Sequence, residues 1–81
     1  MYARQALIET GKNLQEVRVE KGLSVATLAI LSGVAEEIIM DMEQGRFDFP
    51  MEIVFDLAET MNVDFRRVLV DTSLTAGKKV K

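Results

Sequence analysis

The sequence predicts an all-α fold, a compact bundle of five short helices within one domain. Its length of 81 residues suits a single domain with a modest core. Apolar residues recur at intervals of three and four, which is the spacing of helices that bury one face. The clearest example is the stripe Val54, Leu57, Ala58 and Met61. Gly22 and Gly45 follow two other stripes, at positions where a left-handed residue ends a helix.

Composition narrows the possible functions. The sequence contains no Cys and no His, which excludes disulfides and thiolate metal sites and removes the commonest general base. We therefore expect neither an enzyme nor a bound metal or cofactor. No apolar run approaches the ~20 residues that a membrane-spanning helix needs, and no signal peptide is visible. Because the lack of Cys fits a reducing compartment, we expect a cytoplasmic protein with no membrane partner.

The charges are unevenly distributed along the chain. Ten basic and thirteen acidic residues give a net charge of -3, and Lys78, Lys79 and Lys81 all lie at the C-terminal end. We expect residues 71–81 to form a flexible basic tail after a helix-turn-helix domain at residues 1–70, whose elements are justified below. An acidic body is unfavourable for nucleic-acid binding, because that binding rests largely on neutralising phosphates.

The first helix is predicted from about Gln5 to Glu20, where Leu7, Gly11 and Leu14 share one face. Gly11 has two possible effects. It weakens this helix by ~1 kcal/mol relative to Ala, or it permits the close approach of another helix.

The second helix is expected to begin after Ser24, whose hydroxyl can accept a hydrogen bond from a free amide of the first turn. It runs to about Leu31, with Leu28 and Ala29 facing inward. Gly33 is expected to take a positive φ in the turn that follows.

The third helix is predicted from about Glu36 to Gln44, with Ile39 and Met42 facing inward. Two short helices joined by a tight turn that contains Gly are typical of a helix-turn-helix. We therefore predict that the second and third helices form this motif.

The remaining elements complete the bundle. Residues 46–50 form a loop that places Phe47 or Phe49 under the domain. A fourth helix follows from Met51 to Met61, and a fifth is predicted from about Phe65 to Val70.

Several stretches of this sequence resemble the lambda-repressor/Cro (XRE) family of helix-turn-helix regulators. They read G-K-N-L-Q-E-V-R from Gly11, G-L-S-V-A-T-L-A from Gly22, S-G-V-A-E-E-I-I-M-D-M-E-Q-G from Ser32 and P-M-E-I-V-F-D-L-A-E-T-M-N-V-D from Pro50. Together they cover most of the chain. The resemblance implies a lambda-repressor-like fold and a DNA-binding transcriptional regulator that acts as a dimer.

The resemblance also implies a structural role for two charged residues. Arg18 and Glu43 match the family's ion pair, which ties the third helix to the first. A guanidinium can donate two parallel hydrogen bonds to a carboxylate. Removing one partner of such a half-buried pair would cost ~3 kcal/mol. Neither residue is therefore expected to contact DNA.

In the family, DNA is contacted from the start of the second helix and from the outward face of the third. At or beside these positions the candidate DNA-binding residues are Glu36, Glu37, Asp41, Gln44, Arg46 and Lys21. Only Gln44 is an ordinary base reader, whereas Arg46 and Lys21 are suited to phosphates. A Glu can accept a hydrogen bond from cytosine N4, but the neighbouring phosphates repel it.

Other interpretations of this region stay open. Glu36 and Glu37 stand in the first turn of the third helix, where carboxylates stabilise the helix dipole. Val25, Ile38 and Met40 would form an apolar patch typical of a protein interface, unless Ile38 or Met40 belongs to the core. The hypotheses are thus a regulator that binds double-stranded DNA as a homodimer, and a helix-turn-helix module that binds a protein partner.

Overall fold

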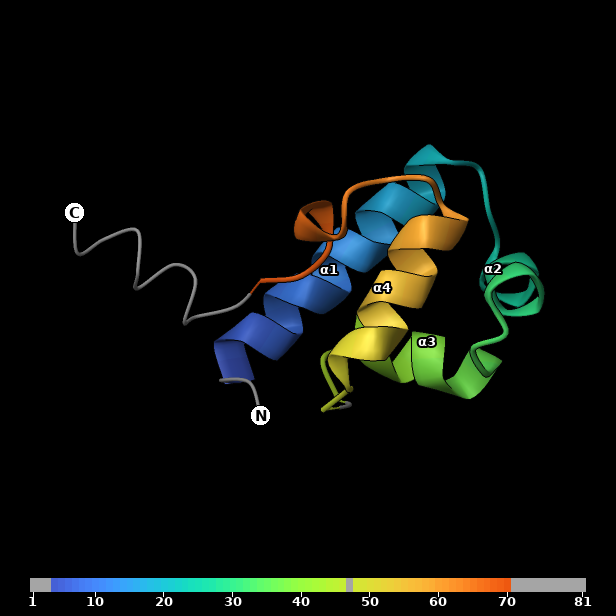
Figure 1. Cartoon of the computed structure of the whole chain (residues 1–81). Coiled ribbons are helices and arrows are strands. Elements are labelled where there is room, and N and C mark those ends of the chain that lie inside the picture. The colour runs from blue at the N-terminus through green and yellow to red at the C-terminus, as the bar shows by residue number, and fades with distance from the viewer. Residues whose placement is uncertain (1–3, 47, 71–81) are drawn as a thin grey trace.

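The computed structural model describes residues 4–46 and 48–70, and these residues form helices joined by short turns (Figure 1). The elements are α1 (Arg4–Glu20), α2 (Val25–Ser32), α3 (Glu36–Glu43), α4 (Met51–Thr60) and a short 3-10 helix, η1 (Phe65–Arg67). The predicted all-α class is confirmed. The expected burial of Phe47 and the expected basic tail at residues 71–81 both lie outside the described residues.

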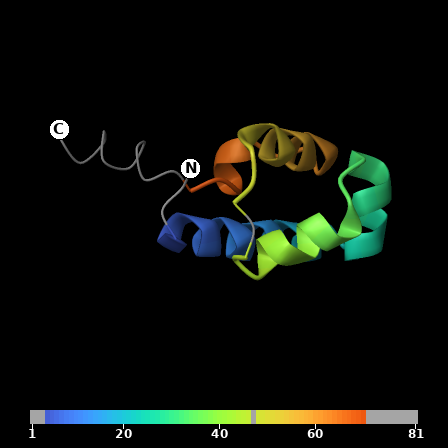
Figure 2. The same ribbon diagram turned by 90° about the horizontal axis from the view of Figure 1, so that it is seen from below.

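The helices form two layers. Figure 2 shows α1 and α3 side by side in one layer and α4 with η1 in the other, while α2 closes one end of the domain and contacts both α3 and α4. None of the described helices has the length and apolar character that crossing a membrane requires.

The core lies between these layers and is mostly aliphatic. Its fully buried side chains include residues from each of the four α-helices, namely Leu14, Val17, Leu28, Ile39, Met42, Val54 and Leu57. The inward positions expected for α2, α3 and α4 are therefore confirmed at Leu28, at Ile39 and Met42, and along the α4 stripe. Phe49, one of the two loop aromatics considered, is also buried in this core.

Gly11 allows α1 and α3 to touch through their backbones. A Cβ atom added at Gly11 would lie 1.9 Å from the carbonyl oxygen of Met42, far closer than any real contact. The second of the two effects considered for this glycine is therefore the one observed. The close approach fixes the position of α3 against α1.

The fifth helix is where the structure departs from the prediction. Instead of a helix over residues 65–70, the chain makes the 3-10 turn η1 and then an irregular segment, Val68–Val70, which we term the C-terminal strap. The side chain of Asn13 donates to the carbonyl oxygen of Val68 (3.3 Å), and the hydroxyl of Thr10 accepts from the amide of Val70 (2.9 Å). These side chains of α1 satisfy two backbone polar groups of the strap, the carbonyl of Val68 and the amide of Val70.

Candidate nucleic-acid interface

The turn between α2 and α3 is held by its own polar groups. The Ser24 hydroxyl caps α2 by accepting from the amide of Thr27 (3.0 Å). Gly33 ends the helix with φ of 78°, in the left-handed region that favours glycine, and its amide donates to the carbonyl oxygen of Ala29 (2.9 Å). Val34 is buried beneath the turn. These contacts set the direction in which α3 leaves α2.

The inner side of α3 is tied to α1 by an ion pair. Arg18 donates from Nε and Nη2 to the two carboxylate oxygens of Glu43, at 2.6 and 3.0 Å, and from Nη1 to the carbonyl oxygen of Leu23 at 2.8 Å. The two side chains are only 12% and 8% exposed. The hydrogen bond to Glu43 raises the pKa of Arg18 above its usual value. Because the guanidinium is fully engaged inside the domain, it is not available to a phosphate.

The outer side of α3 carries a different set of residues, which we term the reading face. It comprises Glu37, Met40, Asp41 and Gln44, at the spacing that places side chains on one helix surface, with Glu36 beside it. Asp41 is half-buried and the others are exposed. Within the described part of the chain, the three carboxylates at positions 36, 37 and 41 take part in no ion pair. The face therefore presents unpaired acceptors to solvent.

The start of α3 lacks a side-chain cap. Ala35 occupies the N-cap position and makes no capping hydrogen bond. Glu36 and Glu37 lie in the first turn, where their charges favour the helix dipole by ~0.3–1 kcal/mol. This stabilising role and a contact with a partner are compatible, because both side chains remain exposed.

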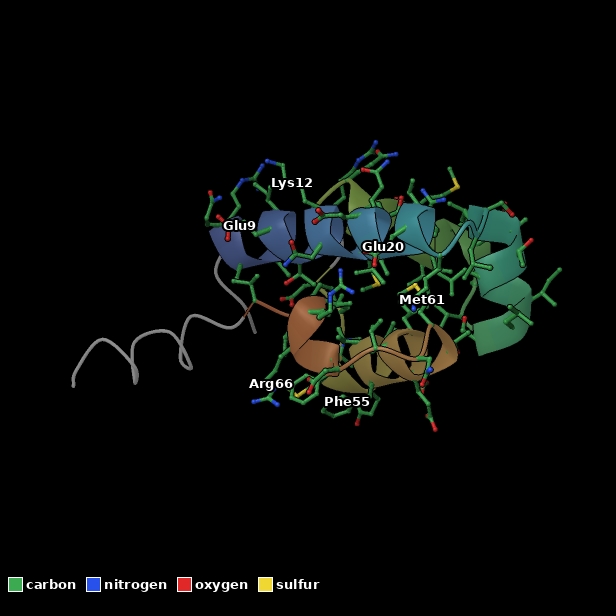
Figure 3. All side chains as sticks on the ribbon, turned by 90° about the horizontal axis from the view of Figure 1, so that it is seen from above. Glu9, Lys12, Glu20, Phe55, Met61 and Arg66 are labelled. Atoms are coloured by element: carbon green, nitrogen blue, oxygen red, sulfur yellow. The ribbon has the colours of Figure 1, made fainter. Side chains whose placement is uncertain are left out.

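Basic side chains near α3 are few. Lys21 is exposed in the turn after α1, and Lys12 is exposed on α1. Arg46 follows α3, and its Nη2 donates to Oε1 of Gln44, so the structure brings these two candidates together. Figure 3 shows Lys12 on the α1 side of the domain and Arg66 on the side of α4 and η1.

The two arginines of η1 are engaged by carboxylates. Arg66 donates to Asp64 (3.0 Å) and Arg67 to Glu20 (2.9 Å). The hydrogen bonds from Arg66 lower the pKa of Asp64 to about 2, and the hydrogen bond from Arg67 lowers the pKa of Glu20. Lys12, Lys21 and Arg46, by contrast, take part in no ion pair among the described residues.

The three residues of the predicted apolar patch differ in exposure. Val25 and Ile38 are partly buried and pack against the core. Met40 is 45% exposed. Of the two residues considered, Ile38 belongs to the margin of the core, and Met40 stays on the reading face.

An exposed aromatic residue on α4 was missed by the sequence reasoning. Phe55 is 42% exposed, and its ring meets that of Phe65 edge to face, with 4.8 Å between the centroids. The two rings line an open groove of about 490 Å³, whose other residues include Glu59, Asn62 and Asp64. Phe55 stands outside the buried stripe of α4, and that position was the signal that could have revealed its exposure.

Comparison with solved structures identifies the family of this domain. The restriction-modification controller protein C.AhdI from Aeromonas hydrophila is 32% identical, over 78% of this chain and 96% of that protein, with a TM-score of 0.74. The chain belongs to the HTH_3 family of Cro/C1-type (XRE) helix-turn-helix domains. No family model and no curated protein matches the sequence.

Two further structures share the fold of this HTH_3 domain at 20% identity. One is an HTH_3 family transcriptional regulator from Vibrio cholerae, with a TM-score of 0.77 over 80% of this chain and 36% of that one. The other is the hypothetical transcription factor NHTF from Neisseria, with a TM-score of 0.76 over 93% of this chain and 87% of that one. The neighbours are regulators rather than enzymes. Among the described residues, no group of acidic side chains is arranged to hold a metal ion.

Proposed function

We propose that this HTH_3 domain is a DNA-binding transcriptional regulator that acts as a homodimer. The observation that carries the proposal is the match to a controller protein over 96% of that protein's length at 32% identity. The intact geometry of α2, the turn and α3 supports it, since a helix-turn-helix presents its second helix to the major groove. A cytoplasmic location and a basic tail at residues 71–81 stay predictions.

In this proposal α3 enters the major groove with its reading face toward the base edges. Glu36, Glu37 and Asp41 would face bases together with Gln44, while the phosphates would meet Lys21, Arg46 and Lys12. Since these three cations are few and the reading face is acidic, binding is expected to be weak and strongly salt-dependent.

The dimer contact is proposed at the groove lined by Phe55 and Phe65. An exposed aromatic side chain beside a groove is typical of a surface that is covered in an assembly. The groove lies on α4 and η1, in the layer opposite α1 and α3, so covering it would leave the reading face free (Figure 2). A twofold dimer of this kind would bind two half-sites on DNA.

The protein-interaction alternative finds no support in the comparisons, whose neighbours are transcriptional regulators. Of its three patch residues only Met40 is exposed, since Val25 and Ile38 pack partly against the core.

Fluorescence anisotropy with labelled genomic fragments across a salt series tests the proposal. We expect binding at ~50 mM salt and a log–log salt slope of about -3 per protomer, from about three phosphate contacts. Replacing Glu37 with Lys should tighten non-specific binding about tenfold at low salt, because it reverses a charge beside the phosphates. Absence of binding at ~50 mM salt would rule out the proposed function.

A charge-matched control is available on α4. Glu52 is exposed in the first turn of α4, in the layer opposite α1 and α3. Glu52→Lys changes the net charge by the same amount as Glu37→Lys, but it should tighten binding much less. Equal effects of the two substitutions would show that α3 does not enter the groove.

A further inference from the structure

The reading face of α3 has an unusual chemical polarity. Glu37 and Asp41 lie one turn apart on it and carry carboxylates, which only accept hydrogen bonds when ionised. Met40 stands beside them with an exposed thioether side chain. The sequence of α3, EEIIMDME, contains no basic residue. The middle of this face can therefore accept hydrogen bonds from a base and make apolar contact, but it cannot donate.

The C-terminal end of the face has the opposite character. Gln44 carries an amide that can donate as well as accept, and Arg46, exposed just beyond α3, carries only donors. Such an end suits an acceptor, either a phosphate oxygen or the O6 and N7 atoms of guanine. The face thus passes from acceptors at Glu37 and Asp41 to donors at Gln44 and Arg46.

The major groove offers few partners for a carboxylate. Guanine presents the acceptors O6 and N7 and thymine the acceptor O4, and all of these repel a carboxylate oxygen. Donors are found only at N4 of cytosine and N6 of adenine. Adenine places its N7 acceptor next to N6, where it opposes the second carboxylate oxygen, whereas the major-groove edge of cytosine carries no acceptor. Cytosine is therefore the better partner.

We propose that Glu37 and Asp41 select half-sites with cytosine at the positions they face, with Met40 against the methyl group of a neighbouring thymine. This inference rests on the proposed function and deepens it, since it names the base that the domain would prefer. It also explains how an acidic helix could serve in a major groove. The carboxylates would exclude sequences that offer only acceptors and would add discrimination rather than affinity.

Selection from a pool of duplexes with a randomised core tests the inference. The wild type is compared with Glu37→Gln, Asp41→Asn and the control Glu52→Gln at ~50 mM salt, where the phosphate contribution is large. The wild type should enrich cytosine within each half-site. Each reading-face variant should bind the pool more tightly, because a negative charge is lost, and should reduce the preference for cytosine at one position by about 5- to 100-fold.

Glu37→Gln should also move the preference at its position toward adenine, since an amide pairs with N6 and N7 together. The control Glu52→Gln should leave the selected sequence unchanged. Circular dichroism of each variant confirms that an altered preference does not come from lost folding.

The outcomes separate the inference from the proposed function. Enrichment of A·T pairs at the contacted positions, or a preference for C·G pairs that both reading-face variants retain, would overturn the inference and leave the regulator proposal standing. Failure of any duplex to be retained at low salt would overturn both.

Discussion

The two sides of α3 differ in whether their residues make contacts within the domain. On the inner side, Ile39 and Met42 are fully buried and Glu43 is paired with Arg18. On the outer side, Glu37 and Met40 project into solvent without a polar partner among the described residues. Each inner residue thus makes a specific contact within the domain. The outer residues make no such contact, which makes that side the place to look for function.

The strongest test of the inner side is to add volume at Gly11. Gly11→Val should destabilise the domain by about 3 kcal/mol or more, because its Cβ would collide with the Met42 carbonyl and force α1 and α3 apart. Urea denaturation followed by circular dichroism measures the loss.

Lys12→Val is the matched control for that substitution. It places the same side chain at the next position of α1, where residue 12 is exposed, and should change the free energy of unfolding by less than about 1 kcal/mol. Similar losses in the two variants would show that the backbone contact does not govern the stability of the α1–α3 layer.

The ion pair on the inner side gives the next largest effect. Arg18→Met should cost about 3 kcal/mol, since it leaves the Glu43 carboxylate half-buried without its partner. The double variant with Glu43→Met should recover part of this loss, because no unpaired charge remains. A double-mutant cycle measures the coupling, and additive losses would contradict the assigned pairing.

Ile38 and Met40, two apolar residues of α3, should differ in how much a substitution by Asp destabilises the domain. Ile38→Asp should destabilise the domain by about 2 kcal/mol, because Ile38 packs against the core, whereas Met40→Asp should change stability by less than about 0.5 kcal/mol. Thermal unfolding of the two variants makes the comparison. Equal tolerance of both substitutions would place Ile38 on the free surface after all.

The smallest expected effect is a pH dependence at η1. Because Arg66 lowers the pKa of Asp64 from 3.8 to about 2, the ionised pair contributes stability above pH ~4 that is lost as the pH falls through about 2. Glu20, whose pKa Arg67 lowers, acts in the same direction.

Asp64→Asn tests this pH dependence while keeping an acceptor for the amide of Arg66. The difference in urea midpoint between wild type and variant should shrink between about pH 5 and pH 2. If the difference in urea midpoint stays constant over this range, the Asp64–Arg66 pair does not contribute to stability.

Much of the fold was predictable because local spacing determines it. The stripe from Val54 to Met61 is buried along one face of α4, and Gly33 takes the positive φ expected of its turn. The fifth helix was not predictable from local sequence, because Val68 and Leu69 would be buried in either a helix or a strap. The choice depends on hydrogen bonds with α1 residues more than fifty positions earlier.

The candidate site was predictable to a smaller extent. The positions of the reading face followed from the resemblance, and the exposure of Glu36, Glu37 and Gln44 agrees with their expected orientation. The partial burial of Val25 and Ile38 did not follow, because it depends on packing against core residues that are distant in the sequence. Which bases these residues would meet in the proposed complex depends on the DNA as well as on the protein, so the protein sequence alone does not specify it.

The C-terminal strap has a consequence for local unfolding. The hydrogen bond from Val70 to Thr10 joins residues sixty positions apart, so it closes nearly the whole domain into one loop. Contacts of such long range carry a high entropic cost and come late in folding. The end of the strap, at Val70, can therefore detach while α1, α2 and α3 keep their mutual packing and Val68 and Leu69 stay in the core. The amide proton of Val70, protected by a single hydroxyl, should exchange with solvent before those of the helices and so report the first opening of the native state.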